Sequence, residues 1–169
     1  MKISARSEYA VLALLYIYEE APRVHEESGL QMGMTPISLR AICQRQSFPE
    51  ALLRKVLQKM ATAGILRSIN GQHGGFFPRK PAAAVSLWDI VSLFEPRAYL
   101  NNCTTDTMLC LSQPTCRLAG AWQKAQAALD EQLRQITYAS LLRAKPQGQV
   151  ATGLTVLGLK SRRQLATSH

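Results

Sequence analysis

Three of the four cysteines of the chain stand close together in the polar stretch NNCTTDTMLCLSQPTC, residues 101–116. Six residues separate Cys103 from Cys110, and five separate Cys110 from Cys116. In a reducing compartment, thiolates at such short spacing bind zinc or iron–sulfur clusters, or act as redox-active groups. Three is an odd number for a closed set of disulfides and one short of the four ligands that a metal centre usually has. The segment therefore predicts a thiolate site that is incomplete by itself.

Positive charge is the second chemical signal, and it is concentrated in one segment. The chain has 20 Lys and Arg against 11 Asp and Glu, a formal charge of +9. Residues 37–80 hold eight of the basic residues and a single acid, Glu50, which gives this segment a net +7. Phosphate backbones are the best match for such a patch, although a solvated face or an anionic membrane surface is also consistent with it.

Length and composition limit the protein to a few classes. A chain of 169 residues with 47% hydrophobic residues can form one domain of ordinary size plus a tail. Its longest apolar run, residues 9–18, is far short of the roughly 20 residues that cross a bilayer, and no cleavage site follows it. We therefore expect a cytoplasmic protein with no membrane segment. The absence of a carboxylate pair or phosphate-cradling motif from the sequence argues against an enzyme.

A mainly helical fold must position these two segments. Apolar spacing predicts a first helix over residues 8–20, capped by Ser7. The stretch that follows breaks this helix, and a shorter helix over residues 39–46 is then capped by Ser38. The fourth cysteine, Cys43, shares the apolar face of this second helix and is expected to be a small buried hydrophobic residue.

The sequence SFPE, residues 47–50, marks the start of a third helix. Ser47 and Glu50 have the spacing of a capping box, and Pro49 is tolerated only in the first helical turn. We expect this helix to run from about residue 49 to residue 63 and to end at Gly64. Two helices joined by a short turn on a basic surface indicate a helix-turn-helix, in which the second helix enters the major groove of DNA.

The third helix has one apolar face and one polar face. Its buried stripe is expected to consist of Leu52, Leu53, Val56, Leu57 and Met60. Its outward-facing residues, which we expect to lie against DNA, are Ala51, Arg54, Lys55, Gln58 and Lys59. Arg is the usual reader of guanine and Lys the usual phosphate contact. Arg40 on the preceding helix is expected nearby.

A glycine-rich hairpin is predicted directly after the third helix. Residues 65–69 and 76–80 have strand character, and the turn NGQHGG between them supplies glycines that permit positive φ and close backbone approach. This order of elements describes a winged helix-turn-helix. The tip carries three further candidate DNA contacts, Asn70, Gln72 and His73. For His73, a solvated turn residue is an equally good interpretation.

Two more helices are expected around the cysteine segment. Ser86 would cap a helix over residues 87–95, and Thr115 would cap a long helix over residues 116–144. A helix of about 28 residues is about 42 Å long and overhangs so small a domain. Its apolar stripe consists of Leu118, Trp122, Ala125, Leu129, Leu133, Ile136 and Ser140. A second copy of the chain would cover this stripe, so we expect a homodimer that binds two half-sites of double-stranded DNA.

The chain is thus expected to have three parts. They are a winged helix-turn-helix DNA-binding domain over residues 1–84, the cysteine loop and dimerisation helix over residues 85–144, and a basic, disordered tail over residues 145–169. The tail has no apolar periodicity beyond Pro146 and therefore predicts no further element.

These motifs together resemble one family. The N-terminal stretch ISARSEYAVLALLYI, the helix-turn-helix, the wing of GxxGG type, the three cysteines and the long helix are similar to the Rrf-two family of bacterial transcription regulators. The family includes iron–sulfur sensors of the IscR and NsrR type and clusterless regulators such as CymR. The resemblance covers about residues 1–144. It implies a dimeric DNA-binding repressor controlled by a [4Fe–4S] or [2Fe–2S] cluster that senses nitric oxide, redox state or iron–sulfur supply.

The resemblance also implies a source for the fourth ligand of such a cluster. IscR-like sites have a histidine three residues after the third cysteine, but this chain has Ala119 there. NsrR-like sites take a carboxylate from the first helix of the other subunit, immediately before the position of Tyr9, where this chain has Glu8. Cys103, Cys110, Cys116 and Glu8 of the partner subunit form the implied ligand set. A favourable charge in the first turn of a helix would equally account for Glu8.

Two departures from the family pattern bear on these expectations. The cysteine gaps are six and five residues where the family's sensors more usually have five and five, and Asn70 stands where a typical member has an arginine before the first wing glycine. An alternative therefore remains open: a clusterless or zinc-binding winged-helix regulator, or one with a thiol switch, controlled by a protein partner or by cysteine oxidation.

Overall fold

The computed structural model describes residues 3–28, 36–71, 74–95, 100 and 116–144. This part of the chain is mainly helical, with one two-stranded antiparallel sheet. The elements are α1 Ala5–Ser28, α2 Leu39–Gln46, α3 Glu50–Thr62, β1 Leu66–Ile69, β2 Gly75–Pro78, the 3-10 helix η1 Ala82–Ala84, α4 Leu87–Phe94, α5 Ala119–Gln135 and α6 Tyr138–Arg143. The predicted mainly helical, winged helix-turn-helix fold is confirmed.

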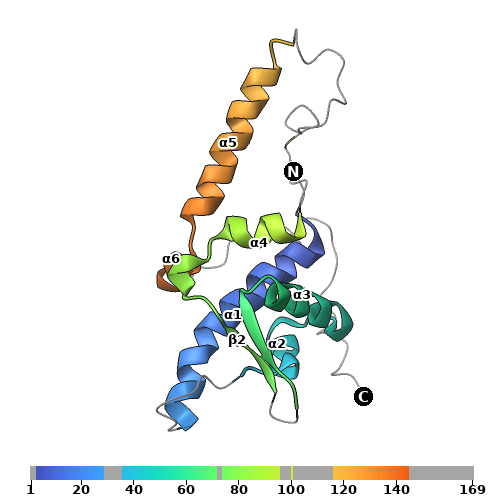
Figure 1. Cartoon of the computed structure of the whole chain (residues 1–169), viewed down its shortest axis with the longest axis vertical. Helices are drawn as coiled ribbons and strands as arrows, with labels where there is room; N and C mark the ends of the chain where they lie inside the picture. The colour runs from blue at the N-terminus through green and yellow to red at the C-terminus, as the bar shows by residue number, and fades with distance from the viewer. Residues whose placement is uncertain (1–2, 29–35, 72–73, 96–99, 101–115, 145–169) are drawn as a thin grey trace, which may run out of the picture.

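Helix α1 forms the centre of the core. Its residues Ala10, Ala13, Leu14 and Ile17 are fully buried and recur at helical spacing on one face. This face packs against α3, α4, α6 and the hairpin, as Figure 1 shows for the surrounding ribbons. Tyr138 of α6 is also fully buried there, with its hydroxyl donating to the backbone carbonyl of Val11 at 3.3 Å. The core thus joins the first helix of the chain to the last one that is described.

The bounds of α1 differ from the prediction at both ends. Ser4 rather than Ser7 begins the helix, because its Oγ accepts from the Ser7 amide at 3.4 Å and its carbonyl accepts from the Glu8 amide at 3.0 Å. Ser7 is fully buried, and its hydroxyl donates to Glu95 instead of capping. The helix also continues through Pro22 to Ser28. A proline inside a helix removes its own amide donor and crowds the carbonyl four residues earlier, at a cost of about 3 kcal/mol, so local preference predicts a break that the structure does not show.

Helices α2 and α3 form the predicted helix-turn-helix, with a different turn. Ser38 caps α2 as predicted, accepting from the Ala41 amide at 3.2 Å. The predicted capping box of Ser47 and Glu50 is wrong. Ser47 has a φ of 54° and ends α2 in the left-handed conformation, so its side chain is not placed to cap the next helix. Pro49 is the residue before α3 and makes no side-chain cap.

The hairpin follows α3 as predicted. Gly64 closes the helix with a φ of 72°, and the strands pair from Leu66 with Pro78 to Ile69 with Gly75. Ile37, just before α2, adds a short third edge: it exchanges two backbone hydrogen bonds of 2.9 Å with Phe76. A Cβ on Gly75 would lie 2.4 Å from the carbonyl oxygen of Ile37, so only glycine fits at this crossing. These bonds fix the hairpin against the helix-turn-helix.

The predicted long helix over residues 116–144 is wrong, because the structure breaks it into α5 and α6. Ile136 and Thr137 adopt extended backbone, and Thr137 caps α6 by accepting from the Ser140 amide. Two hydrogen bonds to the segment at the start of α4 compensate for the break: the Leu87 amide donates to the Ile136 carbonyl at 2.9 Å, and the Tyr138 amide donates to the Val85 carbonyl at 3.0 Å. Tertiary pairing and the burial of Tyr138 thus prevail over helical periodicity.

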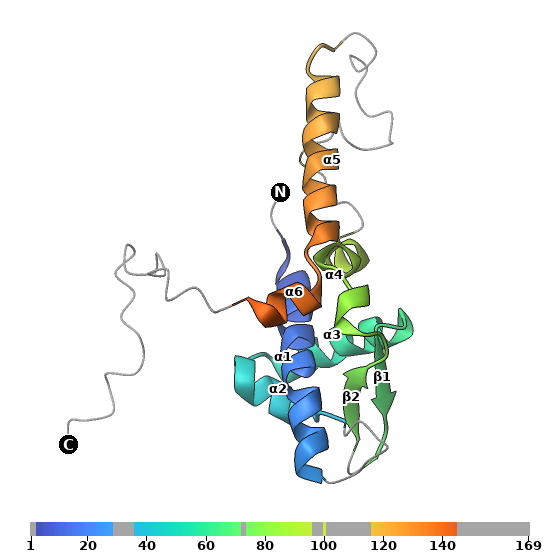
Figure 2. The same ribbon diagram turned by 90° about the vertical axis from the view of Figure 1, so that its left-hand side faces the viewer.

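Figures 1 and 2 show the resulting shape of the described elements. Helix α5 extends away from the other helices, while the hairpin points toward the opposite end of the molecule. Helix α4 follows the hairpin in the chain and begins with a capping box formed by Ser86 and Asp89. It lies beside the end of α5 from which the chain continues into α6. No helix among the described residues is both long and apolar enough to span a membrane.

Candidate nucleic-acid interface

The exposed face of α3 carries the predicted DNA-contacting residues. Leu53, Val56, Leu57 and Met60 are buried on its inner side, as predicted, whereas Leu52 is half-buried. The outward-facing side chains are all exposed, namely Ala51, Arg54, Lys55, Gln58 and Lys59. Helix α3 therefore presents one continuous polar face with three cationic side chains, and it is held in place by the opposite apolar face.

A hollow of about 240 Å³ connects this face to the hairpin. Arg54 and Gln58 from α3 line it together with Ser68 and Asn70 from the hairpin and Leu39 at the start of α2. Helix α3 and the hairpin therefore present guanidinium, amide and hydroxyl groups to one shared space. Such groups form hydrogen bonds with base edges and phosphate oxygens.

The side chains of Arg54 and Lys59 already have contacts within the protein. Arg54 Nη2 lies 2.7 Å from Glu50 Oε1, and both side chains are more than half exposed. Because water screens such an exposed ion pair, the pair is weak. Glu50 can therefore orient the Arg54 side chain, and Arg54 can leave Glu50 for a DNA contact at a small cost in free energy. Lys59 Nζ lies 5.0 Å from the centre of the Phe94 ring, which places the last turn of α3 against the end of α4.

The remaining predicted DNA contacts divide into described and undescribed residues. Arg40 is exposed in the first turn of α2, and Asn70 is exposed directly after β1. Gln72 and His73 lie outside the described residues. The structure thus brings Arg54, Gln58 and Asn70 together around one hollow, and it places Lys55 and Lys59 on the same helix face.

The predicted cluster ligands are only partly described. Cys103 and Cys110 lie outside the described residues, as does the tail over residues 145–169. Cys116 is a half-buried free thiol just before α5, with its carbonyl accepting from the Ala119 amide at 3.3 Å. Glu8 is exposed in the first turn of α1, where its carboxylate makes no hydrogen bond or ion pair with another described residue. The described residues alone contain no group of three metal-binding side chains.

Cys43 differs slightly from its expected environment. It is half-buried and packs against the core, rather than lying fully inside it. Burial raises the pKa of its thiol, the nearby Glu50 carboxylate raises it further, and Arg54 opposes them. The Cys43 thiol therefore loses its proton less readily than an ordinary thiol, which fits the structural role predicted for it.

Two contacts beside Glu8 were not predicted. The Tyr9 ring stacks on Phe48 with 4.3 Å between ring centroids, which joins α1 to the turn just before α3. Glu95, at the end of α4, accepts from the Ser7 hydroxyl at 2.7 Å and from the Ser4 amide at 3.0 Å. Hydrogen bonds from Ser4 and Ser7 hold the pKa of the Glu95 carboxyl below its usual range. A lone acid at the end of an apolar helix is a weak sequence signal, because nothing in the sequence names its partners.

The apolar stripe is uncovered in the single chain at the start of α5, whereas Leu129 and Leu133 farther along the helix are half-buried. Leu118 is 64% exposed and Trp122 is 41% exposed, although both are large and hydrophobic. Closer to the body of the protein the helix is held by other contacts. Gln126 accepts from the Leu100 amide and donates to Asp130, both at 2.7 Å, and Arg134 lies over the Trp88 ring at 4.5 Å.

Comparison with known proteins gives one consistent result. Residues 3–144 match the family model Rrf2, described as an iron-dependent transcriptional regulator. The chain is 27% identical over 143 residues to protein rrf2 of Nitratidesulfovibrio vulgaris, covering 85% of this chain and 88% of that protein.

Two solved structures are similar in fold. T. potens IscR has a TM-score of 0.61 at 21% sequence identity, and the matched region covers 92% of this chain and 96% of the IscR chain. CymR, the global cysteine regulator of B. subtilis, has a TM-score of 0.64 at 22% identity and covers 83% of this chain and 95% of its own. Because the family model spans most of the chain and the fold agrees, this protein belongs to the Rrf2 family of transcriptional regulators, not to an enzyme family.

Proposed function

We propose that this regulator is a dimeric repressor that binds double-stranded DNA through α3 and the wing and responds to an iron–sulfur cluster. The observation that carries the DNA-binding part is the shared hollow of Arg54, Gln58 and Asn70 beside the cationic face of α3. A recognition helix in the major groove would direct Arg54 and Gln58 at base edges, while Lys55 and Lys59 meet phosphates. Arg40, Ala51, Asn70, Gln72 and His73 complete the proposed surface.

The proposed dimer rests on the exposed stripe of α5. Leu118 and Trp122 leave apolar surface in water on a helix that projects from the rest of the molecule. Pairing of two such helices buries this surface and sets two copies of α3 at a fixed separation. A two-fold dimer of this kind matches the half-sites of a palindromic operator.

The proposed cluster is supported by the chemistry of its donors. Cys103, Cys110 and Cys116 supply three thiolates, and the carboxylate of Glu8 from the partner subunit is exposed and uncommitted within the described part of the chain. Three thiolates plus one oxygen donor suit an iron–sulfur cluster, which would supply sensitivity to nitric oxide, redox state or iron–sulfur supply. The match to a family described as iron-dependent favours the same proposal.

Contacts around Glu8 offer a route from the cluster ligands to DNA. Ser7 before it is bonded to Glu95, which directly precedes the chain segment that leads to the cysteines. Tyr9 after it stacks on Phe48, which directly precedes the turn into α3. A change in the position of Glu8 would therefore act on the start of the recognition helix through one stacked ring pair.

DNA binding is tested by measuring affinity for operator and random DNA over a series of salt concentrations. Arg54→Ala should reduce the preference for operator, and Lys55→Ala should weaken binding to both sequences and flatten the salt dependence. Arg143→Ala, which removes an exposed charge from α6, is the matched control. Equal losses on both DNAs for Arg54→Ala would contradict its assignment to base recognition.

The cluster is tested by anaerobic purification with absorption spectroscopy and iron and sulfide analysis. Loss of the visible chromophore is expected for Cys116→Ala, and an altered spectrum is expected for Glu8→Gln. Cys43→Ala and Glu19→Gln, an exposed acid on the same helix, should leave the spectrum unchanged. A colourless, iron-free wild-type protein would contradict the cluster.

A second candidate is a clusterless regulator with zinc or a thiol switch. The likeness to CymR, which shares the fold at a TM-score of 0.64, favours keeping it as an alternative. Zinc and thiols are colourless, so the same absorption spectrum separates the two candidates. Metal analysis then distinguishes zinc binding from cysteine oxidation.

A further inference from the structure

The outer face of the wing hairpin carries a second basic hollow. Leu66, Phe76 and Pro78 turn inward and are buried, whereas Arg67 and Phe77 form a cross-strand pair on the opposite face. Arg67, Phe77, Pro78 and Arg79 line a hollow of about 450 Å³ there. It lies on the other face of the strands from the Ser68 and Asn70 hollow that α3 shares.

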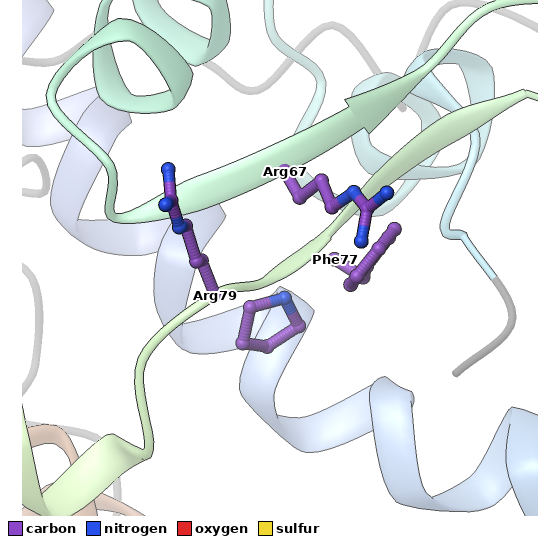
Figure 3. Close-up of a pocket in the computed structure, with 4 residues that line it drawn as sticks. Arg67, Phe77 and Arg79 are labelled. Carbon is purple, nitrogen blue, oxygen red and sulfur yellow. The ribbon is translucent and has the colours of Figure 1, made fainter. Parts of the chain in front are cut away.

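The two guanidinium groups of this hollow are exposed cations. Figure 3 shows Arg67 and Arg79 directed to opposite ends, with Phe77 next to Arg67. The Arg67 guanidinium lies 5.8 Å from the centre of the Phe77 ring, and Arg79 Nη1 reaches toward Gly64 at the end of α3. Neither arginine forms an ion pair with a described residue, and no acid lines the hollow.

This arrangement suits an extended anion better than a small one. A single phosphate or carboxylate is bound most strongly when two guanidinium groups converge on it, and here they diverge. A chain of negative charges can meet both groups in turn, and the half-buried Phe77 ring beside Arg67 offers apolar surface that suits a sugar ring.

The position of the hairpin selects the sugar–phosphate backbone of DNA among polyanions. If α3 lies in the major groove, as proposed, the hairpin that follows it would reach the adjacent minor groove, which is only about 6 Å wide in B-form DNA. A hairpin at that groove has one backbone strand on the side of α3 and the other on its outer side. Arg67 stands two residues before the end of β1, within reach of this second strand.

We infer that Arg67 and Arg79 bind phosphates on the outer side of the wing, with Phe77 packed on a deoxyribose next to the phosphate that Arg67 binds. The inference rests on the proposed binding of DNA through α3 and the wing. It adds two phosphate contacts that bear on affinity and register, not on direct base reading. Both faces of the wing hairpin would then contact the DNA backbone.

The test compares the double variant Arg67→Ala/Arg79→Ala with wild type on operator and random DNA over a salt series. Each lost phosphate contact flattens the slope of log affinity against log salt by about 0.9, so the double variant should lose about 1.8. Both DNAs should be affected equally. Hydroxyl-radical footprinting should show lost protection on the outer flank of each half-site and retained protection at its centre.

Two controls separate the possible failures. Arg67→Lys/Arg79→Lys should restore the salt slope, and Arg143→Ala should not change it; circular dichroism shows whether the alanine variant is folded. If Arg54→Ala weakens operator binding but the double alanine variant leaves slope and flank protection unchanged, the inference is wrong and the proposed function stands. If neither variant affects DNA binding, the proposed function itself fails. If the Arg67→Ala/Arg79→Ala variant binds DNA like wild type but no longer binds an acidic protein segment, the outer hollow binds protein and the inference is wrong.

Discussion

Replacing Ser7 by alanine should destabilise the protein by about 1 kcal/mol at neutral pH. The Ser7 hydroxyl is fully buried and donates to Glu95 Oε1 at 2.7 Å, and the same oxygen accepts from the Ser4 amide at 3.0 Å. Hydrogen bonds to charged groups contribute about 1.5–3 kcal/mol, and the partial exposure of Glu95 reduces this value through solvent screening. Alanine fits the space of serine, so the loss measures the hydrogen bond and not a cavity.

The effect should depend on pH in a defined direction. Because hydrogen bonds from Ser4 and Ser7 lower the pKa of Glu95, the folded state favours its charged form. The contribution to stability is therefore complete above the pKa of an unfolded glutamate, about 4.3, and is lost as pH falls through the lower pKa of the folded state. The difference between wild type and Ser7→Ala should shrink toward acid pH.

Urea unfolding of wild type, Ser7→Ala, Glu95→Gln and the double variant at one protein concentration gives the coupling energy between the two side chains. A coupling of about 1 kcal/mol at pH 7 that declines below pH 5 is expected. A coupling indistinguishable from zero at pH 7, or a difference that grows toward acid pH, would refute the reasoning. Normal stability with altered cluster or DNA response would instead assign Glu95 a regulatory role.

Four further substitutions test the wing, the proposed dimer interface and the core. Gly75→Ala should cost about 2 kcal/mol or more in thermal unfolding, because the new Cβ would lie 2.4 Å from the Ile37 carbonyl oxygen, while Gly120→Ala, with open space around it in α5, should raise stability by about 0.5–1 kcal/mol; equal effects would rule out the crowding argument. Trp122→Glu should convert the proposed dimer to monomer in sedimentation experiments without loss of helical content, since this side chain is 41% exposed in the single chain; an unchanged mass would exclude α5 as the interface. Tyr138→Phe should cost about 1 kcal/mol by removing the donor to the Val11 carbonyl, and no change in denaturant midpoint would show that this 3.3 Å bond contributes little.

The helix-turn-helix and the wing could be predicted because local signals and tertiary packing agree there. The polar face of α3 is exposed and most of its predicted apolar face is buried, as the spacing of Leu53, Val56 and Met60 requires. The hairpin follows from its glycines, since Gly71 has a φ of 116° and Gly75 crosses the Ile37 backbone closely. In these segments the local sequence preferences and the tertiary contacts favour the same conformation, so the spacing of the residues is enough to predict it.

Two of the errors occur where a distant partner decides the local structure. Ser7 has the composition of a helix cap, but Glu95, far along the chain, takes its hydroxyl. Residues 116–144 have helical spacing throughout, but the Val85 and Leu87 backbone pulls Ile136 and Thr137 into an extended pair. Such partners carry no signal in a single sequence, because their distance along the chain says nothing about contact.

The extended pair between α5 and α6 has a further consequence for operator geometry. In the proposed dimer, the orientation of each DNA-binding unit relative to the paired α5 helices depends on the backbone at Ile136 and Thr137, held by two hydrogen bonds of 2.9 and 3.0 Å. Helix α5 has 17 residues and is about 26 Å long, so a 5° rotation at its base moves the far end by about 2 Å. The rise of one base pair is about 3.4 Å. In the proposed dimer such a rotation would move each recognition helix about this joint, so the two-residue joint controls which half-site spacing the dimer can bind.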